Sequence, residues 1–162
     1  MTEPLDVLYR IQRGLSGYVS YLAACEMNPA FSEYVLYEPA LRILTARRYS
    51  VTCEYPCPGL ERVGPGDKKK IDFRAVGHGC ILAIEVKWAK TARINIQEDS
   101  LKLQAFREHV PGSTCCLCVF GRKSHIKNIN LILKTGTFTE KLDPVYAEFR
   151  RTRYGCRIYE LA

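Results

Sequence analysis

One stretch of the chain, residues 70–89, constrains the fold more than any other. Apolar residues alternate with polar or small ones, first with Ile71 and Phe73 on one face and again over residues 80–88. A period of two is typical of strands that have one buried face. Gly77-His78 lies between the two runs, and Gly at the first central position suits a two-residue type II′ turn. The sequence therefore predicts an antiparallel hairpin.

This hairpin brings charged side chains to one face. With a two-residue turn in that position, Asp72 lies opposite Ala83 and on the same face as Glu85 and Lys87. Asp72 and Glu85 are then diagonal neighbours, with Cα atoms about 7–8 Å apart. A three-residue turn would move Asp72 to the other face. Two carboxylates that lean toward one point can bridge a hard cation, so the pattern predicts a candidate metal site.

The spacing resembles the core of the PD-(D/E)XK nucleases, also called the restriction-endonuclease-like superfamily. That core has an Asp, then a tight turn, then Glu-x-Lys on an apolar strand, and the matching residues here are Asp72, Glu85 and Lys87. The resemblance implies that Asp72, Glu85 and the carbonyl of Val86 hold one or two divalent ions. The ion is usually Mg²⁺, for which Mn²⁺ can substitute. The resemblance further implies that Lys87 orients and activates the attacking water.

The chemistry of phosphodiester hydrolysis explains these residue types. A Lewis acid stabilises the charge that develops on the phosphate and generates the nucleophilic water. A nearby ammonium group favours the hydroxide form of that water. The same three residue types also occur on the solvated face of an ordinary sheet, where they form a cross-strand ion pair. The order of the surrounding elements therefore decides between the two interpretations.

Two helices precede the hairpin. Residues 4–26 carry an apolar stripe at helical spacing, which indicates packing without chemistry. Residues 30–48 are predicted to form a second helix, in which Glu38 borders an apolar stripe. The family often carries a Glu on this helix, so the resemblance implies that Glu38 supports the metal or the water, with Glu33 as the weaker candidate. The alternative for Glu38 is an ion pair with Arg42, four residues on.

The remaining patterns complete the element order. A strand, the hairpin, a helix and a strand buried on both faces are predicted at residues 50–56, 70–89, 96–109 and 114–120. With the preceding helix, this is the core order of the nuclease superfamily over residues 30–120. Residues 121–162 are predicted to form an extension of strand, helix and strand, with the helix over 143–153. The fold class is therefore predicted to be α/β (α+β), a mixed central sheet flanked by helices.

Composition is consistent with one globular domain over residues 1–162, which comprises an N-terminal helix within 1–27, the core over about 30–120 and the extension over 121–162. The chain is 47% hydrophobic and 25% charged. It has no apolar run of membrane-spanning length and no signal-peptide pattern at its start, so we expect a cytoplasmic protein without a membrane partner. The eight cysteines match no zinc template and favour reduced core positions.

The net charge of +7 suits a polyanionic partner, and we expect nucleic acid, with DNA favoured. Weaker candidates for contacts with its backbone are Lys69, Lys70, Lys90, Arg93, Lys102, Gln104, Arg122 and Lys123. Paired subunits are common in the superfamily, so the resemblance also suggests a homodimer. The alternative function is a catalytically silent module of the same fold that binds nucleic acid or a partner protein.

Overall fold

The computed structural model describes residues 3–27, 31–60 and 69–162. Its elements, in chain order, are α1 (Glu3–Ala24), the 3₁₀-helix η2 (Glu33–Leu36), α2 (Tyr37–Ala46), β1 (Ser50–Pro56), β2 (Lys70–Gly77), β3 (Cys80–Ala89), β4 (Arg93–Asn95), α3 (Gln97–His109), β5 (Thr114–Arg122), α4 (Lys123–Lys127), β6 (Asn130–Ile132), β7 (Phe138–Glu140), β8 (Val145–Phe149) and β9 (Thr152–Leu161). The predicted start of the second helix, residue 30, lies outside the described residues.

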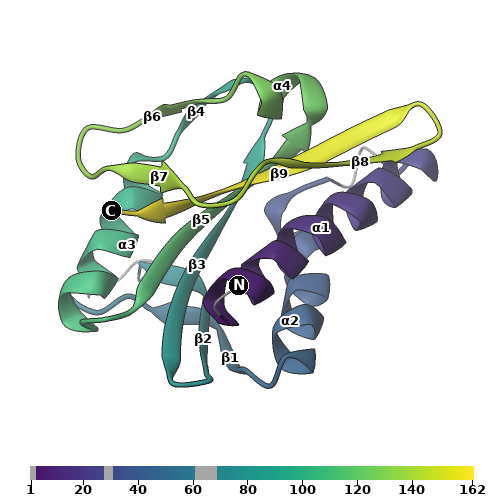
Figure 1. The fold of residues 1–162 in the computed structure, drawn as a ribbon. Coiled ribbons are helices and arrows are strands. Elements are labelled where there is room, and N and C mark those ends of the chain that lie inside the picture. Colours follow the sequence, from purple (N-terminus) through teal and green to yellow (C-terminus); the bar gives the residue numbers. More distant parts are fainter. Residues whose placement is uncertain (1–2, 28–30, 61–68) are drawn as a thin grey trace.

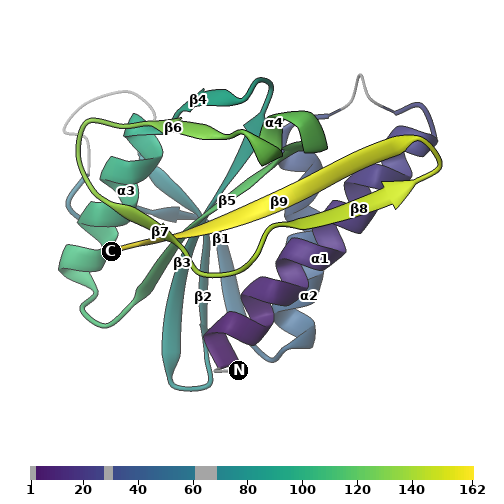
Figure 2. The same ribbon diagram turned by 45° about the horizontal axis from the view of Figure 1, so that its top comes forward.

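A mixed sheet forms the centre of the molecule, as predicted. Its strand order is β1-β2-β3-β5-β9-β7, and β8 pairs with β9 on the same edge as β7 but nearer the start of β9. β3 and β5 run parallel, and the other neighbouring strands run antiparallel. β5 lies between β3 and β9 and is buried along almost its whole length, which confirms the predicted two-sided burial. Figure 2 shows the small parallel pair of β4 and β6 beside α4 at one end of this sheet.

Helices cover both faces of the sheet, with α1 and α2 on one face and α3 on the other (Figure 1). Side chains along β3 point alternately to the two faces of the sheet, so this strand contributes to the core on each face. Leu82, Ile84 and Val86 pack into the core beneath α1 and α2, whereas Ala83 and Ala89 pack into the core beneath α3. Residues 85 and 87 belong to the second set by alternation, so β3 directs them toward α3.

The hairpin turn has two residues, as predicted, but it lies one residue later in the chain. It consists of His78 and Gly79, and both have positive φ (51° and 73°), which is typical of a type I′ turn rather than type II′. His78 Nε2 lies 2.7 Å from the carbonyl oxygen of Arg47, a contact that fixes the turn against the end of α2. The register therefore shifts by two residues. Because the shift is even, Asp72 stays on the same face as Glu85 and Lys87, as the candidate site requires.

The shifted register changes the partner of Asp72. The paired residues of β2 and β3 end at Phe73 and Ile84, and one further step places Asp72 opposite Glu85 rather than Ala83. β2 is also irregular at this point. Ile71 and Phe73 pack into different cores, although a regular strand would put them on one face. The pairing of β1 with β2 skips Glu54, which has a φ of 52°.

The predicted second helix is divided in two. Residues 33–36 form the 3₁₀-helix η2, and the α-helix begins only at Tyr37. Pro39 therefore lies in the first turn of α2, where its missing N–H costs no helical hydrogen bond. Glu33 therefore belongs to η2 and Glu38 to α2.

The C-terminal extension differs most from the prediction. The helix predicted over 143–153 is wrong, because β8 and β9 form an antiparallel hairpin there. Val145, Tyr146 and Phe149 favour strands, and β9 pairs with the second edge of β5. Without that pairing, the buried backbone groups of β5 would lack hydrogen-bond partners. The predicted first strand of the extension is replaced by the short strands β6 and β7.

Two further expectations concern the environment of the chain. None of the helices in the described part of the chain combines the length and hydropathy needed to cross a bilayer. Most of the cysteines are buried, at Cys57, Cys115, Cys116, Cys118 and Cys156. Their predicted use as small core residues is confirmed.

Candidate functional site

The candidate site lies where β2 and β3 separate. Beyond the last paired residues, the backbone N–H groups on this edge of β3 have no partner in β2. The N–H of Val86 instead donates to Asp72 Oδ2 at 2.7 Å, and the N–H of Trp88 donates to Glu33 Oε1 at 3.1 Å. Two carboxylates thus satisfy backbone donors that would otherwise be costly to bury. These contacts fix Asp72 and Glu33 along the opened edge.

A chain of opposite charges continues from this edge onto α3. Lys102 Nζ lies 2.5 Å from Glu85 Oε2 and 3.6 Å from Asp99 Oδ1. Lys87 Nζ lies 3.0 Å from Asp99 Oδ2 and 3.9 Å from Glu33 Oε1. We call this group the carboxylate–lysine cluster, and its members are Glu33, Asp72, Glu85, Asp99, Lys87 and Lys102. It joins η2, β2, β3 and α3.

Of the two carboxylates predicted from the hairpin, Glu85 is buried, with only 1% of it exposed, and Asp72 is partly buried. Burial raises the pKa of Asp72, although hydrogen bonds from Tyr37 and from the N–H of Val86 act against that rise. Burial, and then the neighbouring charge of Asp72, raises the pKa of Glu85 well above its usual range. Tyr37 keeps its proton as a donor to Asp72, because burial and then that carboxylate raise the pKa of Tyr37. Ionised carboxylates are therefore unfavourable here unless a cation accompanies them.

The two lysines of the cluster remain cationic. Burial acts to lower the pKa of Lys87, but Asp99 and Glu33 together outweigh it, so the net shift is upward. The pKa of Lys102 is raised in the same way, since Glu85 and Asp99 outweigh its burial. An ammonium group with a raised pKa is a donor and a positive charge at neutral pH. Lys87 is therefore suited to orient an oxygen atom, and not to accept a proton.

The raised acid pKa values predict how the stability of the metal-free protein depends on pH. An acid whose pKa is higher in the folded state binds protons more tightly when folded, so its contribution to stability falls as pH rises through that pKa. In EDTA, we expect stability to rise from pH 8 toward pH 5, because the folded protein binds the proton of Glu85 more tightly than the unfolded chain does. Glu85→Gln should remove most of this slope.

Urea denaturation at pH 5, 6, 7 and 8 in EDTA measures the effect. Glu98→Gln is the matched control, because Glu98 lies on α3 with a side chain that is 76% exposed. A Glu85→Gln protein with the same pH slope as the wild type would contradict the assignment. Added Mg²⁺ should flatten the wild-type slope, because metal binding requires the ionised carboxylates.

The cluster suits a divalent cation. Its four carboxylates and two ammonium groups leave two net negative charges when all are ionised. Glu85 Oε1 is buried and has no hydrogen-bond partner within the described part of the chain. The N–H and C=O of one strand residue point to the same edge, so the carbonyl of Val86 lies on the side of Asp72. The donors are all oxygen atoms, the ligands that Mg²⁺ and Mn²⁺ prefer.

The site is not a complete protein cage for a metal. Across residues 3–27, 31–60 and 69–162, no group of three or more His, Cys, Asp or Glu side chains converges closely enough to hold an ion. Mg²⁺ needs no such group, because it is usually held by one or two carboxylates and keeps several waters. Asp72, Glu85 and the Val86 carbonyl therefore fit a hydrated Mg²⁺ better than they fit a structural metal.

The structure brings Asp72, Glu85 and Lys87 into one cluster, but it does not bring Glu38 there. Glu38 forms an ion pair with Arg42 on the surface of α2, and its side chain is 63% exposed. The interpretation of Glu38 as a site residue is therefore corrected in favour of its alternative. Glu33 takes the predicted place, because η2 turns it toward the edge of β3.

Sequence reasoning missed two members of the site and undervalued a third. Asp99 and Tyr37 received no role, and Lys102 was only a weak candidate for nucleic-acid contact. Asp99 is only 7% exposed. A buried carboxylate that faces a lysine three residues later is unusual on a helix. The spacing of Asp99 and Lys102 is the one sequence signal for these site residues. It can be used only when the buried face of α3 is known.

The other candidates for contact with nucleic acid divide into three groups. Most are engaged elsewhere: Lys69 pairs with Glu98, Lys70 pairs with Glu54, Lys123 lies over the ring of Tyr146, and Gln104 donates to Ser100. Arg93 is exposed on β4. Lys90 and Arg122 line a pocket of about 280 Å³ together with Trp88 and His125. The lining residues of this pocket on β3 follow Lys87 directly along the strand.

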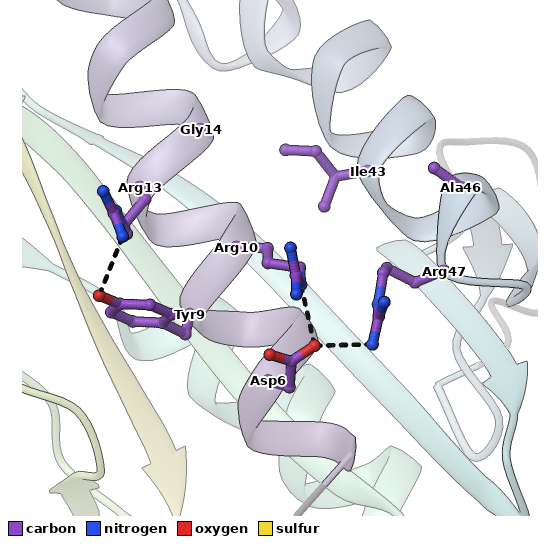
Figure 3. Close-up of a pocket in the computed structure, with 8 residues that line it drawn as sticks. All are labelled: Asp6, Tyr9, Arg10, Arg13, Gly14, Ile43, Ala46 and Arg47. Carbon is purple, nitrogen blue, oxygen red and sulfur yellow. Dashed lines mark hydrogen bonds and ion pairs between the residues drawn. The ribbon is translucent and has the colours of Figure 1, made fainter. Parts of the chain in front are cut away.

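A larger pocket, of about 500 Å³, lies between α1 and α2. Figure 3 shows its arginines, and they are already engaged. Arg10 and Arg47 both contact Asp6, at 2.9 Å and 2.8 Å, and Arg13 donates to the hydroxyl of Tyr9. None of the carboxylate–lysine cluster lines this pocket, so it is separate from the candidate site.

The sequence matches no protein-family model, and it has no significant match among curated proteins or solved structures. The functional interpretation therefore rests on the chemistry of the cluster.

Proposed function

We propose that the protein is a metal-dependent nuclease that hydrolyses phosphodiester bonds, with DNA as the expected substrate and Mg²⁺ as the expected metal. One observation carries this proposal. Asp72 and Glu85 lie on the two strands of an opened hairpin, Glu85 buried and Asp72 partly buried, and Lys87 follows Glu85 on the same face of β3. That arrangement resembles the PD-(D/E)XK core. A buried excess of negative charge beside a fixed ammonium group has the chemistry that metal-assisted phosphodiester hydrolysis needs.

Each residue has a role in this proposal. Asp72, Glu85 and the Val86 carbonyl would hold the ion, which when bound acts as a Lewis acid and lowers the pKa of its water. Lys87 donates to the attacking water or to a phosphate oxygen, and Asp99 and Glu33 position it. Beyond the cluster, Lys90 and Arg122 would contact the nucleic-acid backbone, because the β3 residues that line their pocket follow Lys87 along the strand.

The second candidate function is a silent binding module with the same fold. A module that only binds has no use for buried carboxylates, which destabilise the metal-free protein. The cost of burying them favours an enzyme site, since perturbed acids cluster at functional positions. The two functions differ in their response to metal. A nuclease site should be stabilised by Mg²⁺ or Mn²⁺, whereas the stability of a silent module should be nearly unchanged.

Incubation of the protein with supercoiled plasmid in Mg²⁺, in Mn²⁺ or in EDTA tests the proposal. We expect nicked or linear DNA in either metal and none in EDTA. A parallel incubation with labelled RNA determines which nucleic acid is cleaved. Failure to cleave either polymer, together with an unfolding temperature that is the same with and without metal, would support the silent module.

The two glutamates near the start of α2 give a prediction about cleavage. Glu33→Gln should slow cleavage about 10- to 100-fold, because Glu33 positions both Lys87 and the N–H of Trp88, and outer-shell partners typically have effects of this size. Glu38→Gln is the matched control and should cleave at the wild-type rate, since Glu38 forms its ion pair with Arg42 on the surface of α2. Initial rates of plasmid nicking in Mg²⁺ measure both. A defect confined to Glu38→Gln would contradict the placement of Glu33.

A further inference from the structure

Lys102 lies in an environment that resembles a cation site. Its ammonium group is surrounded by three oxygen atoms from three elements: Glu85 Oε2 at 2.5 Å on β3, the Lys70 carbonyl at 3.1 Å on β2, and Asp99 Oδ1 at 3.6 Å on α3. The side chain is only 14% exposed. Carboxylate and carbonyl oxygens are the donors that a hard metal ion prefers. Lys102 therefore supplies positive charge where the carboxylates need it.

A metal ion and Lys102 compete for the same carboxylate. Glu85 is the main partner of Lys102, and it is also a proposed metal ligand. A divalent ion held by Glu85 and Asp72 would place two positive charges close to the ammonium group, where the repulsion is strong because the site is buried. Lys102 has two other partners already in place, Asp99 and the Lys70 carbonyl. It can keep both of them after it leaves Glu85.

We propose that Lys102 is a displaceable counter-cation. It neutralises Glu85 in the metal-free protein and moves toward Asp99 and the Lys70 carbonyl when a divalent ion binds. This inference rests on the proposed function, in which Glu85 and Asp72 hold the ion. It assigns Lys102 two effects of opposite sign: the residue stabilises the empty site, and it weakens the binding of metal.

A purely structural ion pair would behave differently. If Lys102 only tied α3 to β3, its removal would lower the unfolding temperature with and without metal by the same amount. The concentration of Mg²⁺ that gives half of the stabilisation would then be unchanged. If Lys102 is a counter-cation, its removal should lower that Mg²⁺ concentration, because the metal no longer has to displace the ammonium group. The dependence on metal concentration therefore separates the two roles.

The test is a Mg²⁺ titration of thermal unfolding with wild type and Lys102→Met. Methionine has a similar length and lacks the charge. We expect Lys102→Met to unfold at a lower temperature in EDTA, and to reach half of its Mg²⁺ stabilisation at a concentration at least about tenfold lower than wild type. Lys69→Met is the matched control: Lys69 lies next to β2 but pairs with exposed Glu98, so its Mg²⁺ dependence should equal that of wild type.

Two results would overturn the proposal. If wild type responds to Mg²⁺ and Lys102→Met needs the same or a higher concentration, Lys102 does not compete with metal, and the proposed nuclease site still stands. If neither protein responds to Mg²⁺, the metal site itself fails and the counter-cation fails with it. Lys102→Gln repeats the comparison if Lys102→Met does not fold, because glutamine keeps a hydrogen-bond donor for Glu85 without the charge.

Discussion

Replacement of Lys87 with methionine is expected to slow Mg²⁺-dependent cleavage by about 100- to 1,000-fold, the typical effect of removing one donor that stabilises developing charge. Lys87 is held by Asp99 at 3.0 Å and by Glu33 at 3.9 Å, and its raised pKa keeps it cationic at neutral pH. Methionine fills the same space without a donor. Mg²⁺ binding should persist, because Lys87 is not a proposed ligand.

Single-turnover nicking rates and Mg²⁺-dependent unfolding temperatures measure the two parts of this prediction. Lys127→Met is the control, since it removes a lysine from the exposed end of α4, away from the cluster. Wild-type cleavage by Lys87→Met would show that Lys87 has no part in the reaction. Loss of both cleavage and Mg²⁺ stabilisation would show that it maintains the metal site instead.

Asp72→Asn is expected to abolish both cleavage and the stabilisation by Mg²⁺. We expect cleavage to fall by more than about 100-fold, because residues that only support a metal ligand already have effects of about 10- to 100-fold, and Asp72 is a proposed ligand. Asparagine can still accept the hydrogen bond from the N–H of Val86, so the opened edge of β3 keeps its partner. The removal of a buried charge whose pKa is raised should leave the unfolding temperature in EDTA unchanged or higher.

The unfolding temperature of Asp72→Asn in EDTA and in Mg²⁺ measures this prediction. Tyr37→Phe is an informative companion, because it removes the other hydrogen bond to Asp72 but leaves both carboxylates in place. It should retain Mg²⁺ stabilisation. An Asp72→Asn protein that Mg²⁺ stabilises as strongly as wild type would exclude Asp72 as a ligand.

The central hairpin was largely predictable from sequence. Strict alternation fixes which residues of a strand share a face. A turn with an even number of residues then puts Asp72 on the same face as Glu85, whereas an odd number does not. A turn at His78-Gly79 instead of Gly77-His78 also has two residues, so the error in position changed the residue opposite Asp72 from Ala83 to Glu85 but kept both carboxylates on one face. The buried strand β5 was predictable for a similar reason, because an uninterrupted apolar run fits only a central strand.

The parts that could not be predicted depend on tertiary contacts. Glu33 and Glu38 both belong to one predicted helix, and only the change from η2 to α2 decides which of them reaches β3. Asp99 and Lys102 enter the site through the rotation of α3 against β3, which local sequence does not specify. The mistaken helix over 143–153 has the same origin, because the need of β5 for a second strand partner overrides the local preference of these residues.

The most direct test of the central claim is the initial rate at which wild type and Asp72→Asn, purified side by side, nick supercoiled plasmid in Mg²⁺ and in EDTA. We predict nicking by wild type in Mg²⁺ only, and none by Asp72→Asn in either condition. Equal nicking by the two proteins, or wild-type nicking that persists in EDTA, would contradict a metal-dependent nuclease site at Asp72 and Glu85.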